Sequence, residues 1–144
     1  LVGEGAAAIA GGATADEADM AWAADILGSV GTVVRVAEHH LDAVTGLAGS
    51  GPAYLFLVAE ALIDAGVLAG LSRADSEALT TQLLVGSATL LRERGEPARL
   101  RAQVTSPGGT TAAGLRVLEE HAVRAAFLEA VMAATRRSVE LGQK

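Results

Sequence analysis

The amino-acid sequence predicts a mainly α-helical protein that begins with a short strand–helix–strand segment of the α/β type. After Leu41, apolar residues recur at helical spacing, and the alternation typical of strands disappears. Glycine and proline divide this later part into segments of helix length. Before Leu41, two short runs of apolar and β-branched residues have the length of strands and flank one helical segment.

Length and composition limit the possible classes of protein. The 144 residues suit one domain, or one domain with part of another. Hydrophobic residues make up 51% of the chain but include only one Trp, one Tyr and two Phe, so Ala, Leu and Val must supply the core. The net charge of −6, without a Lys/Arg cluster, argues against nucleic acid or an anionic membrane as partner. The lack of cysteine excludes disulfides and zinc–thiolate sites and allows a reducing compartment.

Two apolar stretches have to be weighed as membrane or leader segments. Residues 51–71 are long enough to span a bilayer, but they contain Glu60 and Asp64, and carboxylates inside a membrane are unfavourable. We interpret this stretch as a buried helix of a soluble protein. Residues 1–10 lack the basic start of a signal peptide, and because the sequence does not begin with Met we expect Leu1 to be a truncation point.

The chain is expected to divide near residue 38. A complete nucleotide-binding half of the βαβαβ type needs more strands than the first part of the sequence provides. Residues 1–38 are therefore interpreted as the tail of an α/β domain and residues 39–144 as a helical domain. The elements predicted in the first part are a strand over 6–10, a helix over 16–27 capped by Thr14, and a strand over 32–36.

Helices separated by glycine and proline are predicted for the rest of the chain. Capping residues and helix-ending glycines set the expected bounds. The predicted helices run over 52–69 with Ser50 as cap, from the Ser72 and Asp75 capping pair to Gly95, over 97–103, over 110–120 and over 122–141.

The predicted helix over residues 52–69 is apolar on nearly every side, with Glu60 and Asp64 as its charged residues. A helix of this kind has to be buried all round, and a domain of this size has few fully enclosed positions. We expect a second copy of the chain to cover part of the helix. The alternative is a central helix in a monomeric bundle.

A loop at residues 106–109 has the composition of a small anion site. Ser-Pro-Gly-Gly does not continue a helix, and its two glycines permit positive φ and a close approach of the backbone. The N–H groups that open the next helix then lie at the positive end of its dipole, which favours a carboxylate. The alternative is a tight turn in which the serine and threonines only cap helices.

Other motif matches are interpreted as false positives. Residues 3–8 match GxGxxA by letters but have no strand before them, and residues 49–51 lack the third glycine of the dinucleotide fingerprint. None of the histidines, His39, His40 and His121, has a partner at zinc-site spacing, so no metal is expected.

Two blocks carry a resemblance to a known family. Residues 41–54 (LDAVTGLAGSGPAY) resemble the segment with which the pyrroline-5-carboxylate reductase family enters its C-terminal domain. Residues 103–115 (QVTSPGGTTAAGL) resemble the family's signature loop and the helix after it. Two predicted helices separate the blocks and one follows, so the resemblance extends over nearly the whole chain.

The resemblance implies a fold and an activity. Residues 39–144 are expected to be a helical dimerisation and substrate domain, and residues 1–38 the tail of a Rossmann domain. The implied reaction is reduction of the ring C=N bond of 1-pyrroline-5-carboxylate to L-proline by NADPH or NADH, in proline biosynthesis. The implied protein is a cytoplasmic homodimer, which in the family is often assembled further into rings. Because the implied nucleotide-binding half is lacking, we expect the chain alone to be inactive.

The resemblance also implies roles for single residues. Thr111 is expected near the ring nitrogen of the substrate, as the catalytic residue. Ser50, Gly51 and Pro52 are expected near the nicotinamide end of the cofactor, with helix capping as the alternative for Ser50. The expected substrate-binding residues are Val104, Thr105, Ser106, Gly108, Gly109, Thr110 and Thr111.

Two other functions remain as alternatives. In the first alternative, the chain is the helical domain of a different two-domain reductase, such as a hydroxy-acid dehydrogenase. In the second, it is a dimerisation module only. A catalytic lysine in the long helix would favour the dehydrogenase, but Lys144 is the only lysine. A dinucleotide fingerprint in the coding sequence upstream of Leu1 would favour the enzyme over the module.

Overall fold

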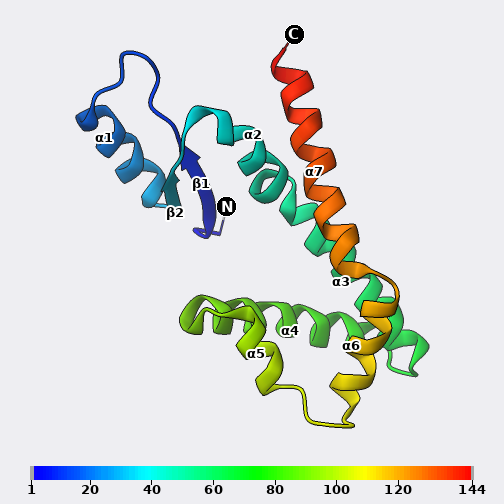
Figure 1. Cartoon of the computed structure of the whole chain (residues 1–144). Coiled ribbons are helices and arrows are strands. Elements are labelled where there is room, and N and C mark those ends of the chain that lie inside the picture. Colours follow the sequence, from blue (N-terminus) through cyan, green and yellow to red (C-terminus); the bar gives the residue numbers. More distant parts are fainter. Residues whose placement is uncertain (1, 144) are drawn as a thin grey trace. The chain divides into compact units, whose positions relative to one another are not determined.

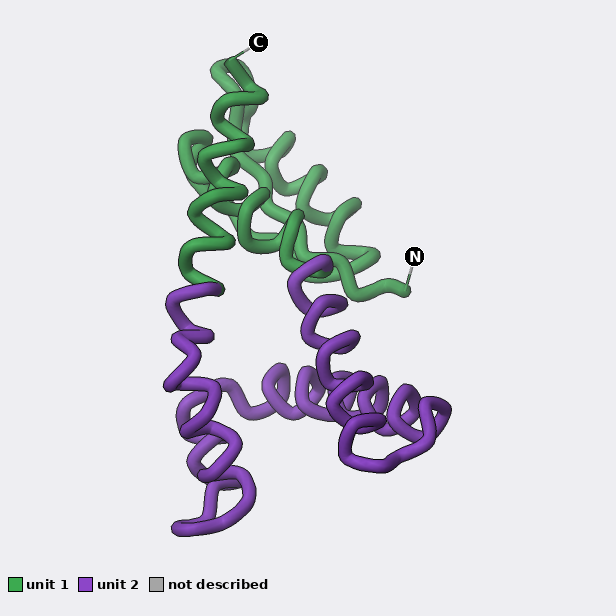
Figure 2. Tube along the Cα trace, turned by 90° about the vertical axis from the view of Figure 1, so that its right-hand side faces the viewer, with its two compact units in different colours: residues 1–52, 127–144 green, residues 53–126 purple. Residues whose placement is uncertain are grey.

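The computed structural model describes residues 2–143 as a series of helices preceded by a small parallel sheet (Figure 1). The chain forms two compact units, one with residues up to 52 and those from 127 onward, the other with residues 53–126 (Figure 2). In chain order the elements are β1 (Gly5–Ile9), α1 (Glu17–Gly28), β2 (Gly31–Arg35), a 3-10 turn η1 (Glu38–His40), α2 (Leu41–Val44), a π-helical turn η2 (Thr45–Gly49), α3 (Gly51–Leu68), α4 (Arg73–Arg94), α5 (Pro97–Gln103), α6 (Thr110–Glu120) and α7 (Val123–Gly142).

A two-stranded parallel sheet begins the first unit. β1 pairs with β2 in a register that runs from Gly5 opposite Gly31 to Ile9 opposite Arg35, and α1 connects the two strands. A side chain on Gly31 would overlap the backbone of Gly5, so glycine lets the strands meet at that end. The predicted strand–helix–strand segment is confirmed, with each strand one residue earlier than expected.

Helix α1 is capped by Asp16, and the prediction that Thr14 caps it is wrong. The Asp16 carboxylate accepts from the Asp19 backbone N–H at 2.9 Å, and the Asp19 carboxylate accepts from the Asp16 N–H at 3.1 Å. This reciprocal pair satisfies two N–H groups that a helix start leaves open, which a single threonine hydroxyl cannot do.

The π-helical turn η2 joins α2 to α3 without a break, so the prediction that Ser50 is an N-cap is also wrong. Ser50 has helical angles (φ −87°, ψ −21°), and its backbone N–H donates to the Thr45 carbonyl oxygen at 2.9 Å, five residues back. Pro52, which has no N–H to give, is tolerated because the π turn already interrupts the α-helical hydrogen-bond ladder just before it.

Helices α4, α5 and α6 of the second unit have the predicted bounds, and α3 begins and ends one residue earlier than predicted. Ser72 caps α4 by accepting from the Asp75 N–H at 3.1 Å, and Gly95 ends the helix with φ of 60°. Helices α5 and α6 begin and end where the sequence predicts. Helix α7, which runs on into the first unit, is shifted by one residue at each end relative to the prediction.

Small residues bring α3 against α4 in the second unit. Ser76 is buried, and its hydroxyl donates to the Ile63 carbonyl oxygen at 2.7 Å. Gly66 faces it across the contact, where a Cβ would overlap the Ser76 Oγ. At the helix ends, Arg73 donates to Asp64 at 2.8 Å, and this hydrogen bond and the carboxylate charge raise the pKa of Arg73. Asp64, one of the charged residues of the apolar helix, is therefore paired with an arginine.

The chain covers little of its own apolar surface. Within residues 2–143 no apolar side chain is buried, and the buried residues are Gly46, Ser76 and Thr80. On α3, Phe56 is 67% exposed and Leu57 is 66% exposed, although both are large and apolar. By length and composition alone, the helical stretch Glu38–Leu68 is long and apolar enough to cross a membrane.

The contact between α3 and α4 predicts the effect of a single methyl group. Gly66→Ala should lower the free energy of unfolding by about 1–3 kcal/mol, because the new Cβ displaces Ser76 from its hydrogen bond and overpacks the contact. The matched control is Gly86→Ala on α4, where a Cβ meets no atom within 4 Å and alanine favours the helix. Urea unfolding at one fixed protein concentration makes the comparison. Equal midpoints for the two variants would contradict the packing described here.

Candidate functional site

The loop between α5 and α6 is built by two glycines with different tasks. Gly108 has φ of +69°, a conformation that side chains rarely adopt. Gly109 has φ of −79°, which any residue accepts, but a Cβ there would overlap the Ser106 Oγ and lie 3.2 Å from the Ser106 carbonyl oxygen. The sequence predicted positive φ and close approach for the pair, and the structure gives one property to each glycine.

Helix α6 starts without a side-chain cap. Its N-cap residue is Gly109, and no side-chain hydrogen bond caps this end of the helix within residues 2–143. The first backbone bond runs from the Ala113 N–H to the Gly109 carbonyl oxygen at 3.2 Å. The N–H groups of Thr110, Thr111 and Ala112 are therefore left at the positive end of the helix dipole. This arrangement suits a small carboxylate.

The hydroxyl groups of the loop divide into structural and available ones. The Thr105 hydroxyl donates to the Arg101 carbonyl oxygen at 2.6 Å, so it closes the end of α5. Thr111 is half-buried at the start of α6, whereas Thr110 is exposed. The alternative in which serine and threonines cap the helices holds for Thr105 at α5 and not for α6. Of the two threonines that begin α6, Thr111 is the less exposed.

Salt bridges connect the helices on either side of the loop. Glu119 of α6 lies 3.7 Å from Arg101 of α5 and 2.7 Å from Arg124 at the start of α7. These side chains are near half exposed, so each pair contributes about 1 kcal/mol or less. Charge therefore lies beside the loop rather than in it, since residues 104–111 contain no charged side chain.

Ser50, Gly51 and Pro52 lie in the first unit, at the junction of η2 with α3. The Ser50 hydroxyl has no hydrogen-bond partner in the described part of the chain, which removes helix capping as its task. A Cβ on Gly51 would meet no atom within 4 Å, so no neighbour in this chain requires glycine. Glycine within a helix is unfavourable by about 1 kcal/mol relative to alanine, so its use here fits the close approach of another molecule.

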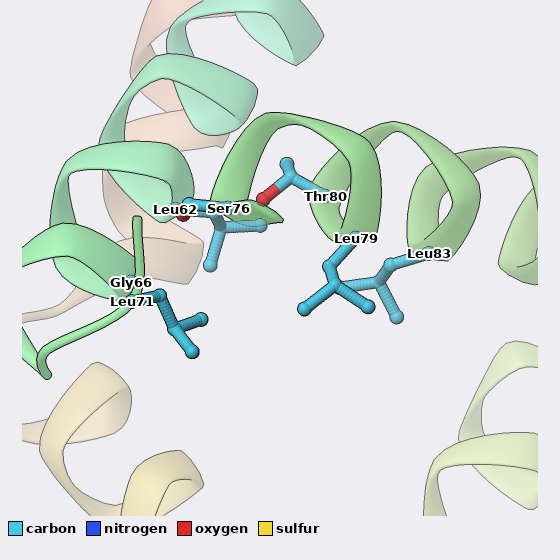
Figure 3. Close-up of a pocket in the computed structure, with 7 residues that line it drawn as sticks. All are labelled: Leu62, Gly66, Leu71, Ser76, Leu79, Thr80 and Leu83. Atoms are coloured by element: carbon cyan, nitrogen blue, oxygen red, sulfur yellow. The ribbon is translucent and has the colours of Figure 1, made fainter. Parts of the chain in front are cut away.

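An apolar groove between α3 and α4 was not predicted from the sequence. It has a volume of about 340 Å³. None of the predicted site residues is among the residues that line it (Figure 3). Leu79 and Leu83 lie one helical turn apart along one side, which is a weak signal because such spacing is common in packed helices. No cluster of three or more metal-binding side chains occurs among residues 2–143. The residues that line the groove are Leu62, Gly66, Leu71, Ser76, Leu79, Thr80 and Leu83.

Known proteins similar to this chain share one family name. A family model described as pyrroline-5-carboxylate reductase dimerisation matches residues 38–141. The pyrroline-5-carboxylate reductase of Synechocystis is 52% identical over 144 residues, which is 99% of this chain and 54% of that protein. The Arabidopsis thaliana reductase is 48% identical over 143 residues, which is 99% of this chain and 52% of that protein.

Solved structures agree with these sequence matches. A pyrroline-5-carboxylate reductase from Coxiella burnetii superposes with a TM-score of 0.93 and 39% identity over 97% of this chain and 53% of that one. A Plasmodium falciparum pyrroline carboxylate reductase with NADP bound gives a TM-score of 0.89 and 37% identity over 98% of this chain and 54% of that one.

The matches cover nearly all of this chain but only part of each relative. The chain spans about half the length of the curated relatives that it matches. The family model covers residues 38–141, which is most of the chain, and the relatives match nearly all of it. The chain therefore belongs to the pyrroline-5-carboxylate reductase family, through the dimerisation domain of that family.

Proposed function

We propose that this chain supplies the dimerisation and substrate-binding part of an enzyme that reduces 1-pyrroline-5-carboxylate to L-proline, in proline biosynthesis in the cytoplasm. The observation that carries the proposal is the open start of α6 behind the Gly108–Gly109 turn, in a chain of this family. The division into a nucleotide-binding tail at residues 1–38 and a helical domain at residues 39–144 belongs to the same proposal.

The α6 end of the loop binds the substrate in this proposal. The backbone N–H groups that begin α6 hold the substrate carboxylate, and the absence of charged side chains in residues 104–111 leaves the helix end as the source of positive potential. The Thr111 hydroxyl then lies near the ring nitrogen and orients it. Val104, Thr105 and Ser106 shape the loop on the α5 side. The ring C=N carbon is thereby fixed in place for hydride transfer, and holding a reactant in position removes part of the entropic barrier to the reaction.

The junction of η2 and α3 faces the cofactor in this proposal. The open space beside Gly51 and the free Ser50 hydroxyl fit the nicotinamide end of NADPH or NADH. When bound, the reduced nicotinamide supplies a hydride to the imine carbon, and the ring nitrogen takes a proton, so that C=N becomes CH–NH. Within this chain, Ser50 and the backbone of Gly51 and Pro52 position the reduced ring. The small parallel sheet is too short to bind the rest of the cofactor by itself.

A second copy of the chain covers the exposed face of α3 in this proposal. Large apolar side chains along α3 and α4 are exposed to solvent in the single chain. A large exposed apolar surface is typical of an interface with another protein. A bilayer is a weaker explanation because α3 carries Glu60 and Asp64, of which Asp64 already pairs with Arg73. Further assembly of such dimers into rings is part of the proposal and rests on the family resemblance.

A dimerisation module without activity is the second candidate function. It is favoured by the family model that matches residues 38–141, because that model is described as a dimerisation domain. The two candidates differ in what accompanies the chain. Reduction of 1-pyrroline-5-carboxylate by a full-length protein that contains this chain supports the enzyme, and a full-length protein that dimerises without turnover supports the module.

The exposed face of α3 predicts that the chain forms a stable dimer. Light scattering at micromolar concentration should give twice the mass of the 14.5 kDa chain. Phe56→Asp should shift the mass to that of one chain, because it places a charge in the covered surface. Trp22→Asp is the matched control, since Trp22 is 69% exposed but lies on α1, before the region that the family model matches. A monomeric wild-type chain would contradict the dimer, and dissociation by both variants would contradict the placement on α3.

The half-buried position of Thr111 predicts a moderate loss on its removal. One orienting hydrogen bond is worth about 0.5–3 kcal/mol, and about 1.4 kcal/mol is tenfold in rate, so Thr111→Ala in the full-length enzyme should lose roughly one to two powers of ten in kcat/KM. Thr111→Ser should recover most of it. Thr110→Ala, which removes an exposed hydroxyl but keeps the backbone N–H, should lose clearly less.

Steady-state kinetics across pH distinguishes positioning from proton donation at Thr111. A loss in kcat of more than about 10⁴ that serine rescues would indicate general acid catalysis by the hydroxyl. Wild-type activity in Thr111→Ala would remove Thr111 from the site.

A further inference from the structure

In the first unit, the π-helical turn η2 packs directly against α7, and the contact leaves no space for an added side chain. Gly46 is buried in this turn. A Cβ on Gly46 would overlap the Thr135 Oγ1 and lie 2.8 Å from the Val131 carbonyl oxygen and 2.9 Å from the Thr135 backbone nitrogen. Two of these neighbours are backbone atoms of α7, so no side-chain rotation relieves the overlap. Glycine at this position is therefore required by the contact.

A polar contact one turn away fixes the same pair of segments. The Ser138 hydroxyl donates to the Asp42 carboxylate at 2.6 Å, and the pair is partly buried. Asp42 precedes Gly46 by one helical turn, and Ser138 follows Thr135 by about one turn. Residues one turn apart share a helix face, so both contacts lie on the same pair of facing surfaces. The Thr135 hydroxyl donates to the Val131 carbonyl oxygen of its own helix at 2.9 Å, which holds it in the place opposite Gly46. One interhelical hydrogen bond and one close backbone approach therefore join the segment that contains the π turn to α7.

The π turn sets the direction of the residues that follow it. Its closing bond, from the Ser50 N–H to the Thr45 carbonyl oxygen, spans five residues in place of four. The extra residue rotates all later residues by about 100° around the helix axis relative to an unbroken α-helix. Ser50 and Gly51 come directly after this rotation. Their direction thus depends on the π turn being kept.

We infer that the contact of Gly46 and Asp42 with α7 is a positioning device that holds the π turn and thereby aims Ser50 and Gly51 at the nicotinamide end of the cofactor. Gly46, Asp42, Thr135 and Ser138 are positioning residues, because they act through residues 50–52. The inference rests on the proposed function, which assigns the cofactor contact to that segment. It adds residues on α7, more than eighty positions away in sequence, to the determinants of cofactor binding.

Gly46→Ala in the full-length reductase tests this inference. Steady-state kinetics should show a rise in the KM for the reduced nicotinamide cofactor and a fall in kcat that together amount to roughly 10- to 100-fold, because small misplacements of a reactant have effects of that size. The KM for 1-pyrroline-5-carboxylate should stay within about twofold, since the loop at residues 104–111 belongs to the other unit. Gly142→Ala is the control: it lies in α7, and a Cβ there meets no atom within 4 Å.

Ser138→Ala keeps the test decisive if Gly46→Ala does not fold. This variant removes one hydrogen bond without adding volume and should raise the cofactor KM by roughly two- to tenfold, again with an unchanged substrate KM. Light scattering and thermal unfolding show whether each variant remains a folded oligomer.

The outcomes separate the inference from the proposed function. A folded variant whose cofactor KM and kcat match those of Gly142→Ala would overturn the positioning role. Equal rises in both KM values, or a loss of activity that only follows a loss of folded oligomer, would show a general structural role and overturn it as well. A wild-type full-length protein that does not reduce 1-pyrroline-5-carboxylate would instead overturn the proposed function.

Discussion

The apolar surface of α3 is the constraint on which the rest of this structure depends. A helix that carries leucine, valine and phenylalanine on nearly every side is stable in water only when most of its circumference is covered. Within residues 2–143 that cover is missing: Phe56 and Leu57 are exposed, and the buried residues are small. A second copy of the chain is the cover that the sequence, the exposed surface and the dimerisation domain of the family all favour. The loop at residues 104–111 and the junction at residues 50–52, which we propose as the substrate and cofactor sites, then belong to a shared assembly.

The contacts that the chain does make within itself depend on small residues at a few positions. Gly66 and Ser76 bring α3 against α4, and Gly46 brings the π turn against α7, each at a distance that no larger side chain permits. Because such contacts bury little apolar area, they contribute little to stability, and their main effect is to fix the direction of the segments that they join. In both compact units, the proposed sites depend on the direction of these segments. The open start of α6 has to face a carboxylate, and Ser50 has to face the reduced ring.

Local signals in the sequence predicted most of the elements, and the failures have a physical cause. Ser72, Gly95 and Pro97 bound their helices as expected, because capping geometry depends on residues within one turn. Ser50 was mistaken for a cap because a π turn keeps the chain helical through a Gly-Ser-Gly-Pro segment that normally breaks it, and the α7 residues that hold this turn are distant in sequence. The sequence also could not show that Gly108 has positive φ and Gly109 does not, because both residues are glycine. The roles of the loop and of residues 50–52 stay predictions, since they concern molecules outside this chain.

The dependence of unfolding on protein concentration tests the central claim most directly, because a core shared between two copies makes folding a bimolecular equilibrium. Urea unfolding of this chain, followed by circular dichroism over about a hundredfold range of concentration, should show midpoints that rise with concentration, by the equivalent of about 2.7 kcal/mol in stability over the full range. A single midpoint at every concentration, from a chain that unfolds cooperatively as a monomer, would contradict the account.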